Sequence, residues 1–159
     1  MDKLTFVLAL IGSLGTAYSI IMTFYWHRVS IECNIIEYCP SKDALIAYMS
    51  FTNHSRLPIS ITNICLWNND VLYNCVHTPE IVQFVSRTSG KQTYQEAIHS
   101  SPLPINLPSL SGTSGYVYFL FPQENFEVSS KSLTVELSTN RHLTLRKTLS
   151  LEKSLHIAR

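Results

Sequence analysis

The sequence predicts a mainly β protein, an antiparallel β-sandwich that follows one N-terminal membrane helix. Three observations lead to this fold class. Residues 4–26 contain no charged side chain. Beyond residue 28, apolar residues recur at every second position in a series of short segments, which is typical of half-buried strands. Turn-forming residues separate these segments about every ten residues, a spacing that favours a sandwich.

The N-terminal apolar segment is long enough to cross a membrane. A helix over residues 4–26 would extend about 34 Å, whereas the hydrocarbon core of a bilayer is about 30 Å thick. Tyr25, Trp26 and Arg28 follow its last apolar turn. Aromatic and basic side chains favour the lipid headgroup level, so we expect these three residues to act as interfacial anchors. The sequence therefore assigns residues 1–28 to a single transmembrane anchor.

A cleavable signal peptide is the alternative for this segment. Ala17-Tyr18-Ser19 has the small side chains of a cleavage site. The apolar run nevertheless continues past it to Phe24, and cleavage would leave that run at a new N-terminus. An uncleaved anchor is therefore the favoured interpretation.

One face of the predicted helix carries small residues. The spacing of this set places its members on one side of a helix, and a strip of small side chains lets a second helix approach closely. We therefore expect association with a membrane protein partner or a homo-oligomer, through Ala9, Gly12, Ser13, Thr16 and Ala17.

Several strands are expected in residues 29–152, and residues 153–159 are assigned to a C-terminal tail. A bulge near Thr62-Asn63 would bring Ile59 and Ile61 into register with Ile64 and Leu66. The polar stretch 87–101 is expected to be a surface loop, with at most a short ordered piece. The proline-containing stretch 102–115 is expected to be an edge segment or connector. The expected strands are 29–35, 44–52, 57–67, 71–76, 80–85, 116–121, 133–138 and 142–151.

These seven or eight strands, with their turns, favour an antiparallel immunoglobulin-like β-sandwich. Three stretches carry a resemblance in addition, namely TNHSRLPISITNI at 52–64, LPINLPSLSGTSGYVYF at 103–119 and LTVELSTNR at 133–141. With the anchor, they resemble a group of small bacterial and prophage proteins that have one membrane helix and a β-sandwich. The resemblance implies a fold and no chemistry, because its motifs are turns and strands.

No catalytic or metal-binding motif is visible in the sequence. There is no Cys-x-x-Cys and no helical pair of histidines, so neither a metal site nor any other cofactor site is predicted. Cys75 and His77 would share one face of a strand, but a strand-end thiol beside a turn histidine is the favoured interpretation. The glycine-bearing stretch 111–115 precedes a strand and lacks the Gly-Lys-Ser/Thr ending of a phosphate loop. The sequence thus predicts a protein that is not an enzyme.

Charge excludes nucleic acid as the expected partner. The net charge is +1 over 159 residues, whereas nucleic-acid-binding domains are usually strongly basic. Six of the basic side chains lie in residues 131–159, which suggests either a charged edge strand or a surface that touches anionic lipid. The charged edge strand is the favoured interpretation.

The sequence gives little information on which side of the membrane the β domain lies, because few charges flank the apolar segment. Cys33 and Cys65 lie in apolar patterns typical of buried free thiols, which favours a cytoplasmic domain. Disulfides among Cys33, Cys39, Cys65 and Cys75 would instead fit the outside. Asn53-His54-Ser55 also matches a glycosylation acceptor, which has meaning only in a eukaryotic secretory setting.

The function expected from these features is that of a non-enzymatic single-pass protein of the cell membrane. Its membrane-proximal sandwich would serve as a protein-interaction module, either as an accessory subunit of a membrane complex or as a prophage-encoded membrane factor. The alternative is an outward-facing, membrane-anchored domain that binds carbohydrate or a surface ligand. That alternative needs exposed aromatic side chains, for which Trp67, Tyr73 and Tyr94 are the candidates.

Overall fold

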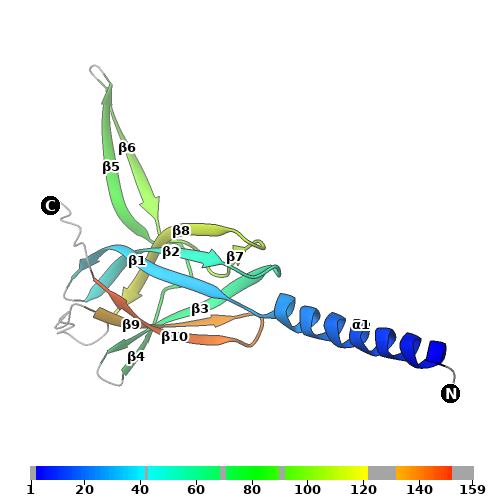
Figure 1. The fold of residues 1–159 in the computed structure, drawn as a ribbon. Coiled ribbons are helices and arrows are strands. Elements are labelled where there is room, and N and C mark those ends of the chain that lie inside the picture. Colours follow the sequence, from blue (N-terminus) through cyan, green and yellow to red (C-terminus); the bar gives the residue numbers. More distant parts are fainter. Residues whose placement is uncertain (1–2, 42, 69–70, 90–91, 122–131, 152–159) are drawn as a thin grey trace.

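The computed structural model describes residues 3–41, 43–68, 71–89, 92–121 and 132–151. Helix α1 comprises Lys3–His27, and every other regular element in the described residues is a β-strand. Within α1, Thr5–Phe24 is long and apolar enough to span a membrane, and none of that stretch is buried against the rest of the chain. Figure 1 shows α1 projecting away from the strands as an isolated rod.

The strands form two main antiparallel sheets. The first has the order β1-β2-β8 and consists of β1 (Ile31–Pro40), β2 (Ala44–Asn53) and β8 (Gly112–Leu120). The second has the order β10-β9-β3-β4 and consists of β10 (Thr144–Ser150), β9 (Ser132–Thr139), β3 (Ile59–Asn68) and β4 (Val71–Asn74). The short strand β7 (Ile105–Leu107) pairs with the beginning of β3, whereas β4 pairs with its end.

A separate two-stranded ribbon leaves the body of the molecule. It consists of β5 (Ile81–Ser89) and β6 (Gln92–His99), which pair with each other along their length. Figure 1 shows the ribbon rising from the sandwich beside β8. No third strand pairs with it in the described part of the chain.

One hydrophobic core lies between the two sheets. Along β2 and β9, buried side chains alternate with more exposed ones, as expected when one face of each sheet packs inward. The largest fully buried side chains come from both sheets and include Leu45, Met49, Phe51, Ile61, Ile64, Leu66, Phe119 and Leu137.

Backbone hydrogen bonds tie the free side of β8 to the segments that enter and leave the ribbon. Val76 N donates to Tyr118 O at 2.8 Å, and Ser101 N donates to Tyr116 O at 2.8 Å. The ribbon is therefore anchored at its base only.

At the opposite edge of the sandwich, a side chain connects the two sheets. Lys147 Nζ on β10 donates to Cys33 O on β1 at 3.2 Å.

The structure confirms a mainly β chain behind one N-terminal helix. The predicted bulge in β3 is also confirmed, because the register between β3 and β9 shifts between Ile61 and Asn63. The expectation of a loop at 87–101 was wrong, since Gln92–His99 forms β6. The polar composition misled the prediction, because an exposed ribbon buries neither face and so needs no apolar alternation. The predicted tail, residues 153–159, lies outside the described residues.

Candidate functional site

The small-residue face of α1 is exposed along its length. A Cβ placed on Gly12 would meet no atom within 4 Å. Ser13 Oγ donates to Leu10 O and Thr16 Oγ1 donates to Gly12 O, both at 2.9 Å. Both hydroxyl groups thus have a hydrogen-bond acceptor in the backbone of the same helix, which makes this face compatible with an apolar environment. Ala9 and Ala17 lie on the same exposed face.

A shallow groove of 300 Å³ continues this face toward the end of α1, between Thr16, Ser19, Ile20, Thr23 and Phe24. Thr23 Oγ1 donates to Ser19 O at 2.8 Å, in the same manner as Thr16 to Gly12. Ser19 and Thr23 were not among the predicted residues of this face. Their signal is the continuation of the same helical spacing beyond Thr16.

The three predicted interfacial anchors lie where α1 meets the sandwich. Tyr25 and Trp26 belong to the last turn of α1, and their side chains are outside the described part of the structure. Arg28 is exposed and follows the helix directly. Only residues 28–30 separate α1 from β1, so at most about 14 Å of chain connects His27 with Ile31.

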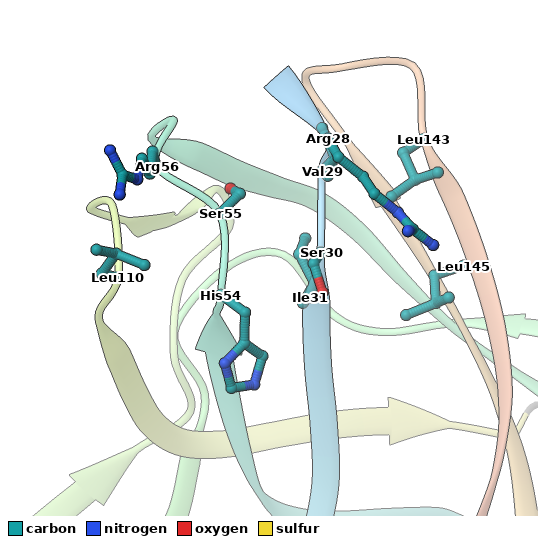
Figure 2. Close-up of a pocket in the computed structure, with 10 residues that line it drawn as sticks. All are labelled: Arg28, Val29, Ser30, Ile31, His54, Ser55, Arg56, Leu110, Leu143 and Leu145. Carbon is teal, nitrogen blue, oxygen red and sulfur yellow. The ribbon is translucent and has the colours of Figure 1, made fainter. Parts of the chain in front are cut away.

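A cleft of 620 Å³ opens at this connection, and we call it the junction cleft. Four chain segments form it, namely 28–31, 54–56, Leu110, and Leu143 with Leu145. Figure 2 shows Arg28 beside Leu143 and Leu145 on one side of the cleft, and Arg56 and Leu110 on the other side. Of the two arginines that line the cleft, Arg28 could be predicted from its place after the apolar segment. Arg56 could not, because only the fold brings it to the cleft.

The buried amide of Asn53 fixes the loop that carries one wall of the cleft. Asn53 is fully buried, and its Nδ2 donates to Leu57 O at 2.8 Å, Pro108 O at 2.9 Å and Leu107 O at 3.3 Å. Its Oδ1 accepts from Ser55 N at 2.9 Å. The amide therefore joins the β2–β3 loop to the loop before β8. It also leaves no accessible amide for glycosylation, so the match of Asn53-His54-Ser55 to an acceptor is not usable in the folded domain.

A contact between His54 and Glu32 lies beside the junction cleft, which His54 lines. His54 Nε2 and Glu32 Oε2 are 3.1 Å apart, and both side chains are about half exposed. Hydrogen bonds from Asn34 and then from His54, with the charge of Lys147, lower the pKa of the Glu32 carboxyl. Glu32 is thus held in its charged form and is already engaged by neighbours.

Two non-glycine residues with left-handed backbones lie at this same end of the sandwich. Leu110, in the loop before β8, has φ 52°, and His142, in the turn between β9 and β10, has φ 54°. This backbone region is unfavourable for a leucine, at a cost of order 1 kcal/mol or more. Leu110 is also 68% exposed. The fold thus presents an apolar side chain to solvent at the helix end of the domain.

Three of the four cysteines are buried thiols. All four are free thiols, and Cys33, Cys65 and Cys75 are buried. Burial raises the pKa of Cys33 and Cys65, and raises the pKa of Cys75 to about 11. These thiols are therefore protonated near neutral pH.

Cys75 and His77 do not form a dyad. His77 Nε2 lies 3.2 Å from Asn63 Oδ1, and Asn63 Nδ2 donates to Cys65 Sγ at 3.2 Å. No group of three metal-ligating side chains comes together within the described residues. The histidine is thus part of a polar network on the outer face of β3.

The aromatic candidates for ligand binding lie apart. Trp67 Nε1 donates to Glu136 Oε2 at 2.9 Å, and the Arg146 guanidinium covers the indole ring at 4.1 Å from its centroid. Tyr73 packs edge-on against Phe121 at 4.8 Å between ring centroids. Tyr94 is exposed on the ribbon. The structure does not bring these three rings together.

The basic side chains of the C-terminal third also diverge. Arg141 lies in the β9–β10 turn, where its guanidinium approaches Pro58 O at 3.5 Å. Arg146 stacks on Trp67, and Lys147 reaches the carbonyl of Cys33. The remaining basic residues of 131–159 are outside the described residues.

The ribbon exposes apolar side chains as well. Ile81 and Phe84 on β5 are 52% and 62% exposed, and Tyr94 on β6 is 59% exposed. A two-stranded ribbon buries little apolar area, so it is marginally stable by itself in water. Within the described residues, the ribbon thus combines exposed apolar side chains with strand edges that pair with no further strand.

Comparisons with known proteins give weak likenesses to solved structures, among them an enzyme. No protein-family model matches the chain, and no curated protein sequence matches it. The chain is similar in fold to part of the GH20 exo-β-N-acetylglucosaminidase from Vibrio harveyi, with TM-score 0.32 and 10% sequence identity. The match covers 80% of this chain and 19% of that enzyme, so the chain spans about a fifth of the enzyme's length. A likeness at this level carries no information about activity.

Proposed function

We propose that this protein is a non-enzymatic single-pass membrane protein whose membrane-proximal β-sandwich serves as a protein-interaction module. The observation that carries the proposal is the isolation of α1. The helix is apolar, unburied and joined to β1 by three residues. An exposed apolar rod of this length is unfavourable in water and stable in lipid.

The order of the strands supports an immunoglobulin-like arrangement for the module. Such domains place strands A, B and E in one sheet and G, F and C in the other. The orders β1-β2-β8 and β10-β9-β3-β4 follow this plan, with β4 in the position of C′. The β5–β6 ribbon would then be an insertion after β4. Sandwiches of this type commonly act in recognition, but fold alone does not assign function.

The ribbon is the part of the module that supports interaction with another protein. It extends both of its edges and the side chains of Ile81 and Phe84 into solvent. Main-chain pairing with a strand from a partner would bury these groups, as in β-augmentation. The partner we propose is another membrane protein of the same complex, one that reaches beyond the bilayer, because Figure 1 shows the ribbon rising from the part of the sandwich that lies away from α1.

The chemistry of the candidate nucleophiles supports a non-catalytic role. The thiol of Cys75 has a raised pKa, and His77 contacts Asn63 instead of the thiol. Catalytic cysteines require the opposite environment, one that lowers the thiol pKa. The cytoplasmic placement, the accessory or prophage role and association through Gly12 and Ser13 remain parts of the proposal. The carbohydrate-binding alternative gains no support from Trp67, because Arg146 covers its ring.

A photo-crosslinking experiment tests the interaction module. A photoreactive phenylalanine derivative would replace Phe84 in one variant and Thr148 in the control, because Thr148 is exposed on β10, far from the ribbon in Figure 1. We expect a discrete adduct in native membranes from position 84 and none from position 148. Equal adducts, or none from position 84, would contradict the ribbon as the contact surface. Extraction of the wild-type chain by alkaline carbonate would contradict the anchor.

A further inference from the structure

The junction cleft lies at the depth of lipid headgroups if α1 spans a membrane. The headgroup layer on each side of a bilayer is about 5–7 Å thick. Arg28 follows the last helical residue, and the cleft is lined by residues 28–31. The walls of the cleft therefore begin where the hydrocarbon ends.

The charge of the cleft favours a phosphate group. Arg28 makes no ion pair with a described residue. Arg56 is exposed on the opposite wall. Arg141, whose guanidinium donates to Pro58 O in the β2–β3 loop, adds a third positive charge at this end of the sandwich. Glu32, the carboxylate beside the cleft, is engaged by Asn34 and His54. Arginine guanidinium groups bind phosphate with paired, charge-assisted hydrogen bonds.

The shape of the cleft favours a ligand that is charged at one end and apolar at the other. Leucine side chains at positions 110, 143 and 145 share the lining with the arginines and with the exposed Ser30. Leu110 is held outward by a left-handed backbone, a conformation that persists only where the surrounding structure enforces it. A phosphate beside acyl chains matches this pairing, whereas a soluble phosphate would leave the leucines in water.

The loop that carries Arg56 is fixed before any ligand arrives. The amide of Asn53 donates to Leu57 O and Pro108 O, and so ties together the two loops that carry Arg56 and Leu110 on one side of the cleft. Such preorganisation lowers the entropy that ligand binding must remove. The cleft is thus a built feature of the fold.

We propose that the junction cleft binds the phosphate-bearing headgroup of an anionic phospholipid in the leaflet where α1 ends, and that this contact fixes the orientation of the sandwich on the membrane. The inference rests on the proposed membrane anchor. The side chains of Arg28 and Arg56 extend away from each other in Figure 2, and both would turn toward the phosphate from opposite walls. Leu110 would lie against the upper part of the acyl chains.

Lipid retention by the purified full-length protein tests the inference. The chain would be extracted in a mild non-ionic detergent and titrated with phosphatidylglycerol or phosphatidylcholine, and native mass spectrometry would count the bound lipids. We expect one phosphatidylglycerol to be retained in preference to phosphatidylcholine. The double variant R28Q/R56Q should bind phosphatidylglycerol about 25-fold more weakly, a factor of about five for each arginine near a membrane surface.

Two matched variants separate the site from general charge and from misfolding. R87Q/R146Q removes the same charge from the ribbon and from β10, and we expect its lipid retention to match the wild type. R28K/R56K keeps both charges and should retain most of the phosphatidylglycerol. Circular dichroism of all variants checks that the sandwich stays folded. If R28Q/R56Q is folded and binds phosphatidylglycerol like the wild type, the inference is wrong.

Two further arms identify the source of the phosphate and the cause of a failure. Glycerol phosphate in millimolar excess should not displace the lipid; displacement with equal affinity would overturn the lipid in favour of a soluble anion. Alkaline carbonate treatment of membranes tests the anchor alone, and we expect wild type and R28Q/R56Q to stay in the membrane. Loss of both would refute the proposed function, whereas retention of both with no lipid preference would refute the cleft alone.

Discussion

The fully buried amide of Asn53 gives the sharpest prediction for the stability of the domain. Replacement of Asn53 by Ala would remove the side-chain donor to Leu57 O, Leu107 O and Pro108 O, and the acceptor for Ser55 N. A buried polar group that loses its partner costs about 1–3 kcal/mol. Since the carbonyls of Leu57 and Pro108 are only part-buried, solvent can satisfy them in part.

The expected loss for Asn53→Ala is therefore about 3 kcal/mol in the free energy of unfolding, near 1 kcal/mol for each of the three hydrogen bonds to backbone groups at 2.8–2.9 Å. In a domain of this size it corresponds to a decrease of about 10 °C in melting temperature. The measurement is thermal unfolding of the full-length chain in non-ionic detergent, followed by the β-sheet signal in circular dichroism. An equal change in the helical signal is not expected, because α1 makes no part of the core.

The control for this prediction is Asn34→Ala. Asn34 is exposed and its Nδ2 makes one hydrogen bond, to Glu32 Oε1 at 3.2 Å. Surface changes of this kind usually stay within about 0.5 kcal/mol. Asn53→Asp, which keeps the oxygen acceptor but points a carboxylate at backbone carbonyls, should be as destabilising as Asn53→Ala at neutral pH. A melting temperature of Asn53→Ala within 2–3 °C of the Asn34→Ala value would refute the reasoning.

Three further predictions concern the helix, the thiols and pH. Gly12→Ile with Ser13→Ile should reduce crosslinked oligomers in native membranes, because the isoleucine side chains would fill the small-residue face, whereas Leu8→Ile on another face should not. Unchanged crosslinking in the double variant would show that this face of α1 does not mediate the association. A thiol reagent at pH 7.5 should label the half-buried Cys39 and leave Cys75 unlabelled, because the pKa of Cys75 is raised to about 11 and its side chain is buried. Rapid labelling of Cys75 in the folded protein would contradict the burial of this thiol. Hydrogen bonds from Asn34 and His54 lower the pKa of Glu32 in the folded state, so the contribution of Glu32 to stability is present above the unfolded value of 4.5 and is lost as the pH falls through the folded pKa. Glu32→Gln should therefore weaken the decrease in stability below about pH 4.5, measured by urea unfolding at a series of pH values, and an identical decrease in the variant would argue against this role.

Local sequence patterns determined the main elements of this protein, because the helix and the strands each have a recognisable pattern of apolar residues. The uncharged run at 4–26 predicted α1, and the alternation at 133–138 predicted β9. Even the bulge in β3 could be inferred, because Ile61 and Ile64 are out of phase and both must reach the core. Such signals are local, since a buried face imposes its spacing on the residues that form it.

The β5–β6 ribbon and the junction cleft were decided by tertiary structure. Gln92–His99 has no apolar alternation, so only its pairing with β5 makes it a strand. Arg28 and Arg56 are separated in sequence by all of β1 and β2, and the antiparallel return of β2 brings them to the same end of the sandwich. The role of Asn53 likewise arises from loops that meet across 54 residues of chain. Sequence periodicity reports which side of an element is buried, whereas a site depends on which ends of distant elements meet, and that is fixed by strand pairing and packing alone.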